Sequence, residues 1–152
     1  MAGACHGAKH GYPTVGVKPT INHVSGMVVS AAMKVHSALG PGLLESAYEA
    51  CLLHELRKQE LRVENQGALP VIYDGVTIDL GYRMDLVVED LVVVELKCVE
   101  EFSRVHYAQP LSYLKLSGKN VGLLLNFHVA PLRDGIKRLV NGRNWEQETG
   151  MN

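Results

Sequence analysis

Apolar side chains recur every three or four positions in several parts of the chain, which is the period of an amphipathic helix. This pattern predicts helices over residues 22–39, 43–56 and 105–116. Gly40-Pro41-Gly42 separates the first two, since Pro before Gly marks a turn. Pro110 is tolerated only in or near a first helical turn. We therefore expect the regular part of the third helix to begin close to Pro110.

Other segments are rich in β-branched and apolar residues and predict strands, over residues 61–73, 76–88, 91–96 and 121–127. Asp74-Gly75 is a strong hairpin signal between the first two of these strands. The third and fourth are almost unbroken apolar runs, which suits strands that are covered on both faces. The sequence thus predicts three consecutive strands, a helix and a fourth strand.

A last helix is predicted from Pro131 to Val140 by the spacing of its apolar residues. The predicted order is then helix, helix, three strands, helix, strand, helix. Strands separated by a helix can lie parallel, while strands joined by a tight turn lie antiparallel. We therefore expect an α/β fold with a mixed central sheet flanked by helices.

Charged residues interrupt the apolar strands at one place. Glu95 and Lys97 are two positions apart in a strand, so their side chains point to the same face, about 6.5–7 Å apart, while Leu96 points the other way. Asp85 lies on the neighbouring strand, beyond a turn at Glu89-Asp90. Charges on a buried strand are costly unless they are paired or bind an ion. A divalent-cation site assisted by Lys97 is one interpretation; a same-face ion pair with a strand-end aspartate is the other.

Composition restricts the class of protein. With 152 residues, 47% hydrophobic and 20% charged, the chain is typical of one globular domain. We expect that domain over residues 21–143, between a flexible N-terminal tail (1–20) and a polar C-terminal tail (144–152). Three separated cysteines argue against a disulfide framework and favour a cytoplasmic protein. No apolar run has the length of a membrane span, so no membrane partner is expected.

The net charge of −1 gives no global attraction for nucleic acid, so any such surface must be local. Against this background five short motifs carry a resemblance. In order, they are Gly42-Leu43-Leu44-Glu45-Ser46-Ala47-Tyr48, Gly81-Tyr82-Arg83-Met84-Asp85, Glu95-Leu96-Lys97, Gln109-Pro110-Leu111-Ser112-Tyr113 and Gly122-Leu123-Leu124-Leu125-Asn126-Phe127. Over residues 36–142 the chain resembles the GxxExxY protein family, which is placed in the PD-(D/E)XK nuclease superfamily.

The resemblance implies a restriction-endonuclease-like core of order α-β-β-β-α-β, which agrees with the order predicted above. It also implies a metal-dependent nuclease that hydrolyses phosphodiester bonds, with DNA expected ahead of RNA. Asp85 and Glu95 would be direct ligands of Mg²⁺ or Mn²⁺, with the Leu96 carbonyl as a third ligand, because a hard cation prefers oxygen ligands. Glu45 would reach the metal directly or through a water; a favourable position at the start of a helix dipole is its alternative interpretation.

The resemblance further implies that Lys97 orients the attacking water and offsets negative charge. Gln109 and Tyr113 are four positions apart and share a helix face; they resemble a Gln-xxx-Tyr element that helps to bind nucleic acid. Gln109 bonded within its own helix, and Tyr113 in the core, would be the structural alternative.

Two other classes of function stay open. One is a nucleic-acid-binding or partner-binding module that keeps the fold without useful catalysis. The other, weaker one is a small-molecule phosphohydrolase. A set with Asp85, Glu95 and Lys97 together favours catalysis, because a binding module needs no such combination. A homodimer is left open.

Overall fold

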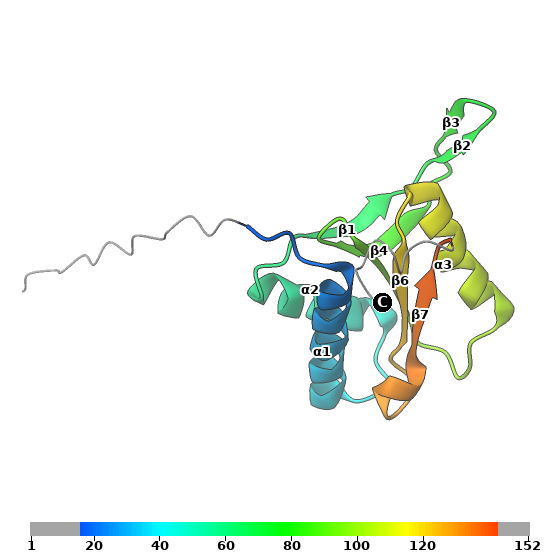
Figure 1. Ribbon diagram of the computed structural model, residues 1–152. Coiled ribbons are helices and arrows are strands. Elements are labelled where there is room, and N and C mark those ends of the chain that lie inside the picture. The colour runs from blue at the N-terminus through cyan, green and yellow to red at the C-terminus, as the bar shows by residue number, and fades with distance from the viewer. Residues whose placement is uncertain (1–15, 143–152) are drawn as a thin grey trace, which may run out of the picture.

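A computed structural model of the protein describes residues 16–142 (Figure 1). Most of the expected N-terminal tail (1–20) and all of residues 144–152 lie outside the described residues. The first helix begins at Ile21, where the domain was expected to start. Of the helices in residues 16–142, none is long and apolar enough to cross a membrane.

The first two helices, α1 (Ile21–Leu39) and α2 (Glu45–Lys58), form one layer beside the sheet (Figure 1). The Thr20 hydroxyl caps α1 by accepting a hydrogen bond of 3.1 Å from the His23 amide. Gly40, at a φ of 67°, ends α1 in a conformation that suits glycine. The two predicted N-terminal helices are therefore present with nearly the predicted bounds.

Seven strands and a third α-helix follow within residues 16–142. They are β1 (Val63–Ala68), β2 (Val71–Tyr73), β3 (Val76–Ile78), β4 (Arg83–Val88), β5 (Val92–Lys97), α3 (Arg104–Ser117), β6 (Val121–Asn126) and β7 (Ile136–Val140). Five strands form one sheet in the order β1-β4-β5-β6-β7, in which β5 and β6 are parallel and the other pairs antiparallel. The predicted mixed sheet flanked by helices is confirmed. The short β2 and β3 pair only with each other and project beyond the sheet (Figure 1).

The core divides between the two faces of the sheet according to strand alternation. Val92, Val94 and Leu96 of β5 pack with α1 and α2 in the larger cluster. Val93, between them, packs with Tyr113 of α3 on the other face. Burying one such aliphatic side chain contributes about 1.5–3 kcal/mol. Glu95 and Lys97 have the parity of Val93, so they lie on the α3 side of the sheet.

Three sequence predictions were wrong. Residues after Pro131 form a short 3₁₀ helix, η1 (Leu132–Gly135), and then strand β7 instead of a last helix. The apolar spacing there suits a helix, but pairing with the edge of β6 prevails, because strand formation depends on tertiary neighbours. The two strands predicted over 61–73 and 76–88 are both interrupted: the first is divided into β1 and β2, and the second into β3 and β4, where Gly81 has a φ of 76°.

The third error concerns α3, which begins at Arg104 and continues through Pro110 rather than starting near it. Ser103 and His106 form a capping box at its start, which supplies a well-defined first turn ahead of the proline. The ring of Pro110 is buried, so packing against the sheet compensates for the hydrogen bond that proline cannot donate.

Candidate active site

The hydrogen-bonded ladder between β4 and β5 runs from the turn only as far as the pair Leu86 and Val94. Beyond this pair, two side-chain carboxylates, instead of backbone carbonyls, accept hydrogen bonds from the strand amides. The Asp85 amide donates to Glu95 Oε1 at 3.2 Å, and the Leu96 amide donates to Asp85 Oδ2 at 2.9 Å. The strands are thus held apart by side chains, and the carboxyl groups of Asp85 and Glu95 lie together in the opening.

Glu95 is almost fully buried, with 2% of its surface exposed. Burial, followed by the nearby charge of Asp85, raises the pKa of the Glu95 carboxyl to about 8. The Lys97 charge opposes this rise without cancelling it. None of the six ion pairs formed within residues 16–142 includes Asp85, Glu95 or Lys97. At neutral pH the buried carboxyl therefore needs a proton or a cation.

Glu45 is the first residue of α2 and is half-buried. Burial raises the pKa of its carboxyl; the Lys97 charge opposes the rise, and the charges of Asp85 and Glu49 add to it. Because the charges of Lys97 and Asp85 act on Glu45, the start of α2 lies near the site formed by β4 and β5. Favourable interaction with the helix dipole also applies at this position, as the alternative interpretation of Glu45 requires.

Tyr48 explains how the loop before Glu45 is fixed. Its hydroxyl donates to the Gly40 carbonyl and accepts a 3.1 Å hydrogen bond from the Leu43 amide. Its ring is fully buried and stacks on Phe127, with centroids 4.6 Å apart. The tyrosine of the Gly-x-x-Glu-x-x-Tyr motif therefore ties the turn to the core, so that α2 starts with Glu45 at the site.

Three polar residues at the site were missed by sequence reasoning. Glu49 Oε1 accepts from Asn65 Nδ2 at 2.6 Å and from Gln66 Nε2 at 2.8 Å. Gln66 Nε2 also lies 3.3 Å from Asp85 Oδ1, and Asn65 Nδ2 donates to the Asp85 carbonyl. Gln66 has a φ of 54°, a left-handed conformation that is uncommon without glycine. The polar run Glu64-Asn65-Gln66 within a predicted strand was the signal available in the sequence.

Gln109 and Tyr113 lie on one face of α3, and the Gln109 Nε2 donates to the Tyr113 hydroxyl at 2.8 Å. Tyr113 is 6% exposed and belongs to the core on that side. Burial raises the pKa of the Tyr113 hydroxyl; the Gln109 hydrogen bond opposes this, and the charges of Glu95 and Asp85 add to it. The structure therefore brings this pair near the carboxylates, although Gln109 also bonds within its own helix.

Only a few side chains at this site could be ligands of a divalent cation. Within the described part of the chain, no three His, Cys, Asp or Glu side chains lie close enough together to hold one ion. Mg²⁺ commonly binds through only one or two carboxylates and keeps several waters. Asp85 and Glu95 supply such a pair of hard oxygen ligands. Burial and the charge of Asp85 disfavour a second unneutralised negative charge on Glu95, as its raised pKa shows. The two carboxylates therefore fit a divalent cation.

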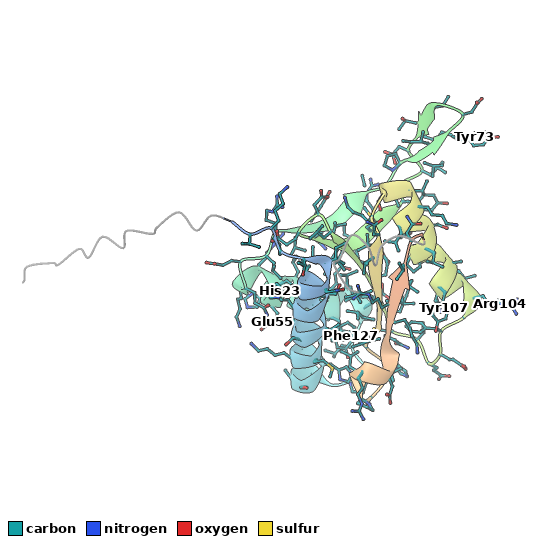
Figure 2. All side chains as sticks on the ribbon, in the orientation of Figure 1. His23, Glu55, Tyr73, Arg104, Tyr107 and Phe127 are labelled. Carbon is teal, nitrogen blue, oxygen red and sulfur yellow. The ribbon has the colours of Figure 1, made fainter. Side chains whose placement is uncertain are left out.

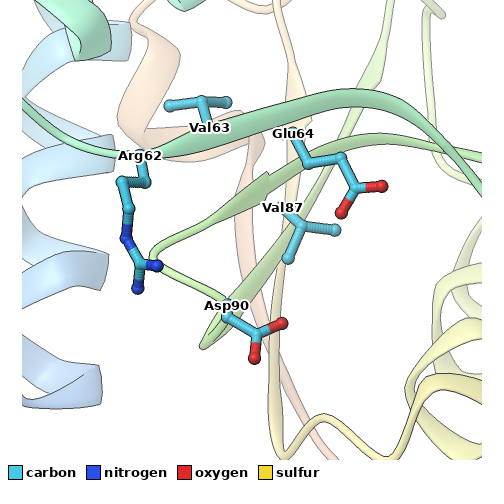
Figure 3. Close-up of a pocket in the computed structure, with 5 residues that line it drawn as sticks. All are labelled: Arg62, Val63, Glu64, Val87 and Asp90. Carbon is cyan, nitrogen blue, oxygen red and sulfur yellow. The ribbon is translucent and has the colours of Figure 1, made fainter.

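Another surface pocket lies toward the turn end of the same strands and contrasts with this site. Arg62, Glu64 and Asp90 line it around Val63 and Val87 (Figure 3). Asp90 forms an ion pair of 2.7 Å with Lys119, and Arg62 forms one of 3.4 Å with Glu89. Asp90 thus has its own cation at an exposed surface, which indicates a structural role for it rather than a catalytic one.

Comparison with known proteins assigns a family. A family model described as the PD-(D/E)XK nuclease superfamily matches residues 22–139. A search of curated proteins finds no match. Among solved structures, LHK-Exo in complex with dAMP aligns with 83% of this chain and 87% of that chain, at 11% identity and a TM-score of 0.41. That likeness is too distant to support an argument about function.

Proposed function

Because the chain belongs to the PD-(D/E)XK nuclease superfamily, we propose that it is a metal-dependent nuclease that hydrolyses phosphodiester bonds of DNA. Family membership supports a nuclease-type function, and the site refines it. The observation that carries the proposal is the pair Asp85 and Glu95, placed where the β4–β5 ladder opens. A fold that needed these strands only for stability would continue the ladder through this position.

In this proposal Asp85 and Glu95 hold Mg²⁺ or Mn²⁺, with the Leu96 carbonyl as a further ligand. Glu45 would act through a bridging water, since no third Asp, Glu, His or Cys of the described residues lies close enough to the pair to hold the same ion. When bound, such an ion lowers the pKa of a coordinated water and neutralises phosphoryl oxygens. The amides of Leu96 and Gln66 orient the Asp85 carboxylate by hydrogen bonds to its two oxygens.

Lys97 has the complementary role. Its ammonium influences the pKa of both Glu45 and Glu95, so it lies within electrostatic reach of both. Three N–H donors let it hold the attacking water and stabilise negative charge on the phosphate. Gln109 and Tyr113, at the edge of the site, would contact the nucleic acid rather than the ion.

The finer family assignment is part of the proposal. The contacts of Gly42, Glu45 and Tyr48 support membership of the GxxExxY family, because each has a definite role at the start of α2: Gly42 has a φ of 107°, Glu45 opens the helix, and Tyr48 fixes the loop. The reduced state expected of Cys51 and Cys98 supports a cytoplasmic location.

The test is to incubate the purified protein with single-stranded, duplex, nicked and branched DNA, each with Mg²⁺, Mn²⁺ or EDTA. We expect cleavage of at least one DNA with a metal ion and none in EDTA. Lys97→Ala should lower cleavage about a hundredfold, and Lys119→Ala is the matched control, because Lys119 is paired with Asp90 away from the site.

Binding without cleavage under every metal condition would contradict the nuclease and favour a binding module on the same fold. Hydrolysis of a small phosphodiester without action on any nucleic acid would instead favour the phosphohydrolase.

A further inference from the structure

A pocket of about 450 Å³ lies between α3 and the base of the β2–β3 hairpin. Its lining includes Tyr82 and Tyr113, the apolar side chains of Val105 and Leu116, and the polar Gln109 and Ser112. No charged side chain of the described residues lines it. Such a surface suits a flat, neutral ligand with a polar edge, since aromatic rings stack and amide and hydroxyl groups form hydrogen bonds.

The two tyrosines form an ordered wall of this pocket. Their rings are 6.4 Å apart and tilted by 52°. The Leu69 amide donates to the Tyr82 carbonyl at 2.9 Å, and Leu69 is itself buried, so the backbone of Tyr82 is held to the core. Tyr82 as a residue remains 44% exposed. A partly exposed aromatic residue whose backbone is fixed can stack on a ligand with little ordering cost.

The pocket lies beside the candidate active site. Tyr113 lines it and packs in one cluster with Met84, next to Asp85 in β4, and with Val93, which has the parity of Glu95 in β5. A neutral, partly aromatic pocket thus adjoins the charged site to which the proposed function assigns the phosphate. The two halves match the two chemical parts of a nucleotide, a flat base and an anionic phosphodiester.

Several large apolar side chains of the β2–β3 hairpin and the segment after it are exposed. Ile72, Tyr73, Val76 and Leu80 are 64%, 72%, 58% and 62% exposed. The hairpin projects away from the sheet, with Tyr73 on its outer part (Figure 2). None of these four residues lines the pocket, so the apolar group on the hairpin is a surface separate from it. Stacked and paired bases of a duplex have no free face for such a pocket, whereas unpaired bases stack on aromatic side chains.

We propose that this pocket binds an unpaired base of single-stranded DNA and thereby directs the adjacent site to single-stranded regions. This inference rests on the proposed nuclease function for its biological meaning, but it concerns binding alone. Tyr82 is the residue that determines specificity, and Tyr113, Gln109 and Ser112 complete the pocket.

The test measures fluorescence anisotropy of a short labelled DNA oligonucleotide in EDTA, so that cleavage plays no part. We expect the single strand to bind at least about tenfold more tightly than its duplex. Tyr82→Ala should weaken single-strand binding by about tenfold, the usual loss when one stacking ring is removed. Tyr73→Ala, an exposed tyrosine of the same hairpin that does not line the pocket, should leave it unchanged.

A second measurement requires no variant. The wild-type protein should bind an oligonucleotide with abasic sites in place of its bases about tenfold more weakly, because only the phosphates remain. The proposal is overturned if abasic DNA or duplex binds as well as the normal single strand, if Tyr73→Ala weakens binding as much as Tyr82→Ala, or if no DNA binds. In the last case the apolar hairpin would be left to a protein partner.

The same preparation is assayed for cleavage with Mg²⁺ or Mn²⁺. Cleavage with equal binding of single strand and duplex removes this inference and leaves the nuclease. Single-strand binding without any cleavage removes the nuclease and leaves the pocket.

Discussion

Each end of the β4–β5 pair carries two acidic residues, but the surroundings of these residues differ between the two ends. At the turn end, Glu89 and Asp90 both adopt positive φ angles and close a tight hairpin. The Glu89 carboxylate accepts from the Arg62 amide at 2.7 Å, and Asp90 pairs with Lys119 at 2.7 Å. The Lys119 hydrogen bond and charge hold the pKa of Asp90 below its usual range. Both carboxylates at this end therefore have a cationic partner.

At the open end, Asp85 and Glu95 share no ion pair with any described residue. They take the places of backbone carbonyls, and the pKa of Glu95 is raised to about 8. The comparison teaches that an acidic residue becomes a candidate for function when the fold buries it and gives it no cation. Carboxylates that repel one another on a rigid sheet are ready for an added ion.

The largest expected difference between the ends is catalytic. Asp85→Asn should lower DNA cleavage by about a thousandfold, since a bound cation supplies several kcal/mol of transition-state stabilisation. Asp90→Asn should leave cleavage within about twofold of wild type, because its exposed ion pair contributes about 0–1 kcal/mol of stability. Cleavage rates of both variants with Mg²⁺ check this. Equal losses in the two variants would mean that the site does not lie at the open end.

The second prediction compares the lysines. Lys97→Ala should lower the cleavage rate about a hundredfold, the usual effect of removing one donor that stabilises transition-state charge. Its metal affinity should persist, since Lys97 is not a ligand. Lys119→Ala should change neither quantity. Rates and Mg²⁺ calorimetry on the two variants separate these effects; a Lys97→Ala protein with full activity contradicts the role assigned here.

The third prediction concerns pH in the presence of EDTA. The folded pKa of Glu95, about 8, lies above the ordinary glutamate pKa of 4.5, so the native state binds a proton that the unfolded state releases. This contribution to stability is complete at acid pH and is lost as pH rises from about 4.5 to about 8. At about 1.4 kcal/mol per pKa unit, the loss amounts to a few kcal/mol.

Urea denaturation at several pH values measures this trend. Glu95→Gln should flatten the decline, because the amide needs no proton, and Mg²⁺ should restore wild-type stability mainly at the higher pH. Parallel pH profiles of wild type and Glu95→Gln would contradict the raised pKa.

The smallest expected effect concerns how Asp85 is held. Gln66→Gly removes the hydrogen bonds to Asp85 and Glu49 but suits the φ of 54° at this position. Stability should change little, and kcat should fall about tenfold with KM nearly constant. Glu60→Gly is the matched control, with a φ of 61° outside the site. A similar kcat in both variants would show that Gln66 is only a turn residue.

Much of the site was predictable because its signals are local. The alternation of Glu95 and Lys97 along one strand, and the turn at Glu89-Asp90, follow from short-range geometry. The same holds for the order of α1, α2, α3 and the sheet strands β1, β4, β5 and β6, whereas the breaks that separate the β2–β3 hairpin were missed. Strand β7 was missed because Ile136 to Val140 has an apolar spacing that fits a helix equally well, and only the free edge of β6 decides between them.

The end of the β4–β5 ladder at Asp85 could not be predicted from the sequence for a related reason. It depends on contacts among Glu49, Gln66 and Glu95, which come from three elements far apart in the chain. No local pattern shows that Gln66 turns its backbone to reach Asp85. The residue types predicted the chemistry of the site, and the tertiary contacts determined its geometry.

The central claim is that Asp85 and Glu95 bind a divalent cation at the open end of β4 and β5. The most direct test is a crystal soaked in Mn²⁺, in which anomalous scattering locates the ion. The account predicts a peak between the two carboxylates, in coordination distance of both, and none beside Asp90. A crystal with Mn²⁺ bound elsewhere, or with Glu95 still hydrogen-bonded to the Asp85 amide and no ion in the opening, would contradict it.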